Sequence, residues 1–183
     1  MSFPANRFTL FFSEPRTRQG APLHMELAIF IGLQGAGKTT FYRARFAESH
    51  VCVSKDRLRN NRRPGRRQRQ LIEEALLAGQ SVVVDNTSPT RSDRAELIEL
   101  GHRYGAEVVA YYFESRLEDC LERNRSRTGK ERVPDVALYS TAKKLEQPSI
   151  AEGFDRLFYV RLVGDHNFEV LDWARAPVNH ETQ

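Results

Sequence analysis

Cysteine and histidine are too sparse in this 183-residue sequence to indicate a metal centre or a disulfide framework. Cys52 and Cys120 have no metal-ligand spacing, and the five histidines are scattered without forming a ligand pair. Both cysteines fall in apolar or helical patterns, so we expect them to be small core residues. This usage fits a reducing compartment, and the sequence therefore predicts a cytoplasmic protein.

Long hydrophobic runs are also missing. No apolar run approaches the roughly 20 residues of a membrane span, so no membrane partner is expected. Residues 1–24 hold only a short apolar run, followed by Pro15, Gly20 and Pro22, and we predict a loosely ordered N-terminal extension. The remaining composition is that of one globular unit, which we place at residues 25–165, with a C-terminal tail at 166–183.

A complete phosphate-loop motif lies between residues 32 and 39. The stretch reads G-x-x-x-x-G-K-T, follows the apolar run 27–31 and precedes a segment that can form a helix. Glycines let successive N–H groups curl around an anion; Lys38 would reach the β- and γ-phosphates, and the Thr39 hydroxyl would bind Mg²⁺. A glycine-rich turn that binds nothing is the alternative, and the complete motif with both flanks argues against it. The predicted ATP-binding residues here are Gly32, Leu33, Gln34, Gly35, Ala36, Gly37, Lys38, Thr39 and Thr40.

Apolar and amphipathic segments alternate along the chain, which predicts an α/β fold of three layers. Strands are expected at 27–31, 51–53, 81–85, 107–113 and 157–163, with one possible edge element at 168–171. Helices are expected at 38–47, 66–77, 92–104 (capped by Ser92), 117–127 and 134–144. This order predicts a five-stranded, mostly parallel sheet with helices on both faces, and a ligand site at the carboxyl ends of its strands.

Polar residues after two of these strands could carry chemistry. Asp56 and Arg59 lie three residues apart at a helix start, so they share a face; the carboxylate could take a hydroxyl proton and the guanidinium could hold an anion. A capping aspartate beside a surface arginine explains the same spacing equally well. Asp85 and Thr87 follow the third strand, where an acid can hold magnesium or orient an acceptor; an Asx turn is a common alternative, but the position at the carboxyl edge of the sheet favours the functional role.

Arginines gather in two places. Arg123 and Arg127 lie one helical turn apart before a charged loop, and could form a lid that brings positive charge to a migrating phosphoryl group. Seven arginines between residues 57 and 69 suggest a polyanionic second substrate. The plainer alternatives are a basic helix face and a solvated loop.

Together the phosphate loop, Ser54–Arg59, Val84–Thr87 and Glu122–Arg127 with Val133-Pro134 resemble the 5′-kinase domain of the polynucleotide kinase family. Lys143–Pro148 and Glu152–Phe154 are also similar to that family, and the resemblance covers residues 26–163. No Asp-x-Asp phosphatase signature and no ligase segment are found. The density of arginines from residue 57 to 69 exceeds that expected of the family.

The resemblance implies a P-loop kinase fold, ATP and Mg²⁺ as cofactors, and a nucleic acid 5′ end as acceptor. It implies that Asp56 is the general base and that Arg59 binds the phosphate on the 3′ side of the terminal nucleotide. It places Asp85 and Thr87 in the acceptor site, and Arg123 and Arg127 on the donor phosphates. The predicted catalytic residues are thus Lys38, Asp56 and Arg127, and the predicted metal ligands are Thr39 and Asp85.

We therefore expect an ATP- and Mg²⁺-dependent kinase of 5′-hydroxyl ends, with DNA and RNA both open and the oligomeric state unspecified. Two alternatives remain. A small-molecule kinase for a sugar, nucleotide or antibiotic hydroxyl could use the same scaffold, because the fold does not determine the substrate. A nucleotide-dependent switch protein would need the phosphate loop but no base such as Asp56.

Overall fold

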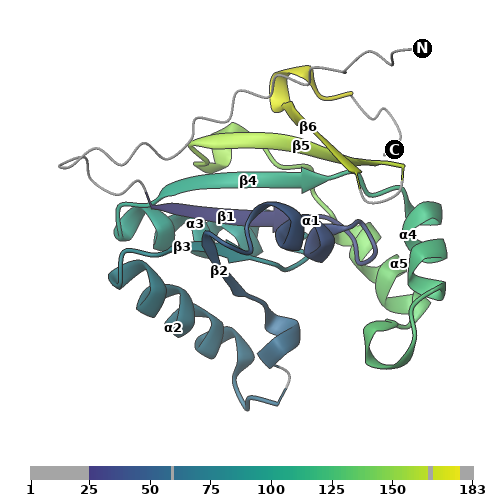
Figure 1. The fold of residues 1–183 in the computed structure, drawn as a ribbon, viewed down its shortest axis with the longest axis horizontal. Coiled ribbons are helices and arrows are strands. Elements are labelled where there is room, and N and C mark those ends of the chain that lie inside the picture. Colours follow the sequence, from purple (N-terminus) through teal and green to yellow (C-terminus); the bar gives the residue numbers. More distant parts are fainter. Residues whose placement is uncertain (1–24, 59, 165–166, 178–183) are drawn as a thin grey trace, which may run out of the picture.

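A six-stranded sheet lies between two layers of helices in the computed structural model, which describes residues 25–58, 60–164 and 167–177 (Figure 1). The strands are β1 (Glu26–Ile31), β2 (His50–Val53), β3 (Ser81–Val84), β4 (Glu107–Phe113), β5 (Arg156–Val163) and β6 (Asn167–Asp172). Their order in the sheet is β2-β3-β1-β4-β5-β6, and every pairing is parallel except that of β5 with β6. The three-layer α/β fold with a mostly parallel sheet is confirmed.

The sheet has one strand more than the five predicted. β6 is the possible edge element of the sequence, and it pairs antiparallel with β5 within the range assigned to a tail. An edge strand contacts a partner on one side only, and the β6 side chains are half-buried or exposed, so its apolar pattern is weak. The division of the chain at residue 165 stays a prediction.

Alternation along the strands decides which helices cover which face. Leu27, Ile29 and Ile31 of β1 pack with α2 (Pro64–Leu77) and α3 (Arg91–Arg103). Ala28 and Phe30 point to the opposite face. That face is covered by α1 (Lys38–Arg45), α4 (Leu117–Arg125) and α5 (Asp135–Lys144). β1 is buried on both faces, so side chains on its faces are not open to a ligand. The phosphate loop follows the carboxyl end of β1 and therefore lies at that edge of the sheet.

The described residues also form four short 3₁₀ turns, three between these elements and one after β6: η1 (Lys55–Leu58), η2 (Gly129–Glu131), η3 (Ile150–Glu152) and η4 (Trp173–Arg175). Helix α3 is capped by Thr90 rather than by the predicted Ser92, because Thr90 forms a reciprocal capping box with Asp93. Pro134 is the N-cap of α5 and not its first residue. Cys120 is buried as predicted, whereas Cys52 is only half-buried.

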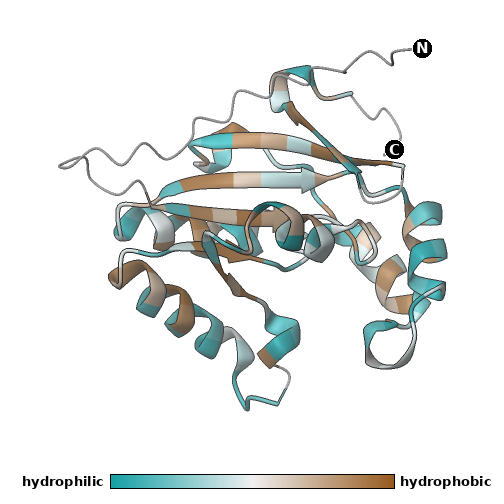
Figure 2. Cartoon of the chain, viewed as in Figure 1, coloured by the Kyte–Doolittle hydropathy of each residue, from teal (hydrophilic) through white to brown (hydrophobic). Residues whose placement is uncertain are grey.

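Two sequence predictions cannot be compared with the fold. The predicted extension at residues 1–24 and the predicted site residue Arg59 lie outside the described residues. Within the described part of the chain, no helix is both long and apolar enough to cross a membrane. Figure 2 shows that α2 is hydrophilic where it begins and apolar toward its carboxyl end, so its arginine-rich start faces away from the core.

Candidate active site

The phosphate loop connects β1 to α1, and its tight turn needs glycine at positions 35 and 37. Gly35 and Gly37 have φ angles of +84° and +94°, which side chains with a Cβ atom rarely adopt. A Cβ atom at Gly35 would also lie 2.6 Å from the carbonyl oxygen of Cys120 in α4. The loop is therefore built against α4, and only glycine allows that approach.

Lys38 is buried in this loop with its ammonium group bound to the backbone. Its Nζ donates to the carbonyl oxygens of Gly32 at 2.9 Å and Leu33 at 2.6 Å. Burial lowers the pKa of Lys38 from 10.5 to about 8, and the charges of Asp85 and Asp56 oppose this while Arg127 adds to it. Asp56, Asp85 and Arg127 are thus close enough to Lys38 to act on its charge.

Several N–H groups of the loop have acceptors within the protein. Gly32 donates to the carbonyl oxygen of Thr87, Leu33 donates to the Ser115 hydroxyl, and Ala36 donates to Leu33. These bonds tie the loop to the segments that follow β3 and β4. The first N–H groups of α1 have no acceptor within a helix, so a phosphate would meet the loop at the start of α1. Contacts of ATP with the other predicted loop residues remain a prediction.

Thr39 and Asp85 form the oxygen pair that the sequence predicts as metal ligands. The Thr39 hydroxyl donates to Oδ2 of Asp85 at 2.7 Å. Among the described residues, no group of three or more histidine, cysteine or acidic side chains could hold a metal ion. Mg²⁺ does not need such a group, because it keeps several waters and uses one or two protein oxygens with the phosphates of its nucleotide. The pair therefore fits Mg²⁺ bound together with a nucleotide.

The two predicted lid arginines occupy different environments. Arg123 donates from Nε to the carbonyl oxygen of Gly35 at 2.8 Å, so it holds the phosphate loop against α4. Arg127 follows α4, is half-buried and acts on the charge of Lys38. Asn124 lies between them, fully buried, and its amide bonds both the N–H and the carbonyl oxygen of Val133. The two hydrogen bonds between Asn124 and Val133 fix both ends of the segment 126–132. The role of the two arginines on donor phosphates stays a prediction.

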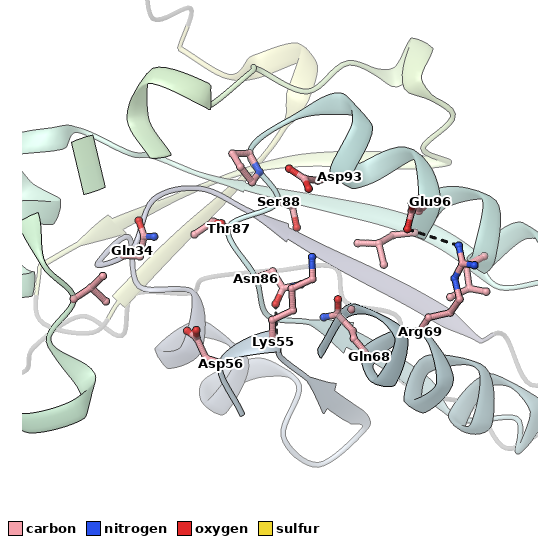
Figure 3. Close-up of a pocket in the computed structure, with 15 residues that line it drawn as sticks. Gln34, Lys55, Asp56, Gln68, Arg69, Asn86, Thr87, Ser88, Asp93 and Glu96 are labelled. Atoms are coloured by element: carbon pink, nitrogen blue, oxygen red, sulfur yellow. Dashed lines mark hydrogen bonds and ion pairs between the residues drawn. The ribbon is translucent and has the colours of Figure 1, made fainter. Parts of the chain in front are cut away.

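A cavity of about 420 Å³ lies beside the phosphate loop, between α2 and α3 and the loop that follows β3 (Figure 3). It is lined by Gln34, Lys55, Asp56, Gly65, Gln68, Arg69, Asn86, Thr87, Ser88, Pro89, Asp93, Glu96, Leu97, Leu100 and Val133. Of the four predicted acceptor residues, Asp56 and Thr87 line it. Asp85 contacts Thr39 instead, and Arg59 is outside the described residues.

Arg94 is a residue of this region that the sequence analysis missed. It is fully buried on α3, where its guanidinium binds both oxygens of Glu152 at 2.7 and 2.8 Å. It also donates to the carbonyl oxygens of Ser88, Pro89 and Glu146. Arg94 thus fixes the cavity wall after β3, in which Ser88 has a positive φ of 41°. Its charged partner Glu152 lies 58 residues later in the sequence, so no local signal marks the burial of Arg94.

Comparisons with known proteins agree with this geometry. The model of a family described as "AAA domain" matches residues 27–148. A bifunctional polynucleotide phosphatase/kinase of Schizosaccharomyces pombe is 27% identical over 72% of this chain and 32% of that protein, so the chain spans about a third of its length.

Two solved structures share the fold. A fungal RNA kinase has a TM-score of 0.62 at 15% identity, over 78% of this chain and 40% of that chain. A gluconokinase of Sinorhizobium meliloti has a TM-score of 0.56 at 22% identity, over 80% and 87%. The resemblance to polynucleotide kinase seen in the sequence is confirmed, and the chain belongs to the AAA domain family with a P-loop kinase domain.

Proposed function

We propose that this protein transfers the γ-phosphoryl group of ATP to a 5′-hydroxyl end of DNA or RNA, in a cytoplasmic setting. One observation carries the proposal: Gln34 of the phosphate loop and the Asp56 carboxylate line the same cavity. A hydroxyl group in that cavity would lie between a phosphate cradle and a carboxylate. Phosphoryl transfer needs this arrangement, since its catalysis is mostly positioning and charge stabilisation.

Each residue then has a defined task. Asp56 takes the proton of the acceptor hydroxyl, whose oxygen forms the new bond to the γ-phosphorus while the bond to the leaving ADP oxygen breaks. Lys38 and Arg127 hold the negative charge of the phosphates. Thr39 and Asp85 would hold Mg²⁺, which neutralises charge on the phosphate oxygens. Arg123 keeps the phosphate loop in place through Gly35.

The start of α2 favours a polyanionic acceptor over a small one. Arg62, Arg63 and Arg66 are exposed there, while Gly65 and Arg69 of the same segment line the cavity. A strand whose terminal hydroxyl enters the cavity would therefore pass along a basic surface. We name Arg62, Arg63 and Arg66 the α2 arginine row. A small-molecule kinase is the second candidate, supported by the fold shared with gluconokinase and by a cavity near the lower end of the roughly 300–1,000 Å³ range of ligand pockets.

Incubation with γ-labelled ATP and Mg²⁺ tests the proposal. Label should pass to 5′-hydroxyl DNA or RNA oligonucleotides and not to the same oligonucleotides carrying a 5′-phosphate. Gluconate and free nucleosides serve as small-molecule acceptors in parallel reactions. Label found only on a small molecule would favour the second candidate, and ATP binding without any transfer would favour a switch protein.

Asp56→Asn tests the base. Transfer should fall by about 10²- to 10⁴-fold, because the amide cannot take the hydroxyl proton, while the affinity for ATP stays nearly unchanged. Glu99→Gln is the matched control, since Glu99 is an exposed carboxylate on α3 that pairs with Arg103. Rates under single-turnover conditions and ATP titrations separate the two effects. Equal loss of transfer and of ATP affinity would contradict the role of Asp56.

Replacing the whole α2 arginine row by glutamine tests the choice between polymer and small molecule. In a plot of the logarithm of acceptor affinity against the logarithm of salt concentration, the slope should become less negative. The slope should change by about two units if two to three phosphate contacts are lost. Arg43→Gln with Arg45→Gln is the control, because these exposed arginines lie on α1, on the opposite face of the sheet. The same salt dependence in both variants would remove the row from the acceptor path.

A further inference from the structure

Gln68 of α2 lines the cavity, and its amide nitrogen is buried and unsatisfied. Only 3% of its surface is exposed, and within the described part of the chain its Nε2 has no hydrogen-bond partner. In Figure 3 its side chain extends from α2 toward Lys55 and Asn86. An unpaired buried N–H group is costly, because the protein has removed water from it without replacing the bond. A ligand that accepts from Nε2 would restore that bond.

The two ends of the cavity have different chemistry. Figure 3 places Gln34 at one end and the pair of Arg69 and Glu96 at the other, where their charged groups lie 3.7 Å apart. Leu97 and Leu100 of α3 give the end near α3 an apolar wall. We call this end, lined by Gln68, Arg69, Glu96, Leu97 and Leu100, the inner compartment; Gln68 and the two leucines are its buried part, and the exposed Arg69 and Glu96 side chains border it.

We propose that the inner compartment receives the nucleobase of the acceptor's terminal nucleotide and that Gln68 Nε2 donates a hydrogen bond to the edge of this base. The inference rests on the proposed function, which places the 5′-hydroxyl near Gln34 and Asp56 at the other end. A base has apolar faces that suit the leucines, and carbonyl oxygens or ring nitrogens at its edge that accept from an amide.

Other groups of the acceptor suit the inner compartment less well. A phosphate would meet the Glu96 carboxylate, which already pairs with the Arg69 guanidinium there. A second sugar would place hydroxyl groups against the apolar wall of Leu97 and Leu100, at a cost in desolvation. A pocket that combines an apolar wall with a few placed polar groups is typical of recognition of a flat heterocycle. Gln68 is therefore a specificity-determining residue rather than a catalytic one.

The experiment uses 5′-hydroxyl oligonucleotides that are identical except at the first residue, which carries adenine, thymine or no base. For the unmodified protein, loss of the base should raise KM by about tenfold or more with little change in kcat, since the contact is remote from the reacting atoms. Gln68→Met keeps the chain length and removes the amide, and should raise KM for base-containing ends by about threefold to tenfold. It should leave KM for the abasic end unchanged.

Two further variants sharpen this result. Gln70→Met is the control, because Gln70 lies on the same helix but is exposed and bonded to Glu74. It should behave as the unmodified protein. Gln68→Glu replaces the donor by an acceptor, so it should penalise thymine, which presents carbonyl oxygens, more than adenine, which presents an amino group and no carbonyl.

Each outcome decides the inference. Transfer to no oligonucleotide by the unmodified protein would remove the proposed function and this inference together. Transfer with the same KM for abasic and base-containing ends would leave the proposed function standing and overturn the inference, and this comparison needs no variant. If Gln68→Met lost affinity for ATP, the variant would be disturbed as a whole and the wild-type abasic comparison would decide alone.

Discussion

At the carboxyl edge of the sheet, Lys38 is buried with its ammonium group bound to two carbonyl oxygens. At the amino edge, Glu26 is also largely buried, but among the described residues its Oε1 has no hydrogen-bond partner. Burial shifts the pKa of both groups toward neutral pH: that of Lys38 is lowered to about 8, and that of Glu26 is raised to about 7. Only at the carboxyl edge do neighbouring groups favour binding of an ion.

The amino edge gathers polar residues without arranging them around a ligand. The five parallel strands begin with Glu26, His50, Ser81, Glu107 and Arg156. Burial and the nearby charge of Glu107 raise the pKa of Glu26, and Arg156 only partly offsets them. Burial lowers the pKa of His50 to about 4, so this ring is neutral at pH 7 and offers no counter-charge at its 3.9 Å distance from Glu26.

The difference between Lys38 and Glu26 shows which buried charged residues indicate a functional site. A shifted pKa alone occurs at both edges, and structural groups produce it as readily as functional ones. At the carboxyl edge the shift comes with a glycine loop, a hydroxyl-carboxylate pair and a cavity. At the amino edge it comes with an orphaned oxygen and a neutral imidazole. We therefore assign the proposed function to the carboxyl edge, whereas the buried Glu26 at the amino edge carries an energetic cost that substitution can remove.

In the comparison of the two edges, the largest expected effect is on the rate of phosphoryl transfer. Lys38→Met should lower phosphoryl transfer by about 10²- to 10³-fold, because it removes a charge aimed at the transferring phosphate. Glu26→Gln should leave transfer unchanged, since Glu26 lies at the opposite end of β1 from the phosphate loop. Initial rates of label transfer at saturating ATP measure both. A loss of similar size in the two variants would break the comparison.

The sequence predicts the carboxyl edge well because its signals are local. The phosphate loop, Thr39 and the acid after β3 are each identified within a few residues of a strand end. The apolar alternation that defines β1 and β3 is likewise short-range, so the layers of the fold are predictable. The 2.7 Å contact of Thr39 with Asp85 then follows from the parallel order of β1 and β3.

Features that depend on partners far away in the chain could not be predicted from the sequence. Arg94 sits in a polar stretch of α3 and is fully buried only because Glu152, 58 residues later, pairs with it. Gln68 looks like one more polar residue of an arginine-rich helix, and only the folded chain shows that it is buried and lines the cavity. β6 is half-exposed at the edge of the sheet, and its pattern therefore lacks the continuous apolar run of a central strand.

A smaller effect concerns stability at the amino edge. The folded-state pKa of Glu26, about 7, lies above its unfolded value of 4.5, so the carboxyl stabilises the fold below pH 4.5 and loses this contribution as pH rises through 7. Glu26→Gln should therefore raise the free energy of unfolding by about 3 kcal/mol at pH 8 and change it little at pH 4.5. Urea denaturation at the two pH values measures the difference. The same gain at both would show that the charge of Glu26 is not its cause.

The smallest effect returns to Lys38 and the affinity for ATP. With a pKa of about 8, the charged fraction of Lys38 falls from about three-quarters at pH 7.5 to about one-tenth at pH 9. Because the phosphates bind the ammonium form, the dissociation constant of ATP should rise about eightfold over this range. Adenosine, which has no phosphates, is the control and should show no such rise. A flat response for ATP would mean that Lys38 keeps its proton throughout, and that the bonds to Gly32 and Leu33, with the charge of Asp85, outweigh its burial.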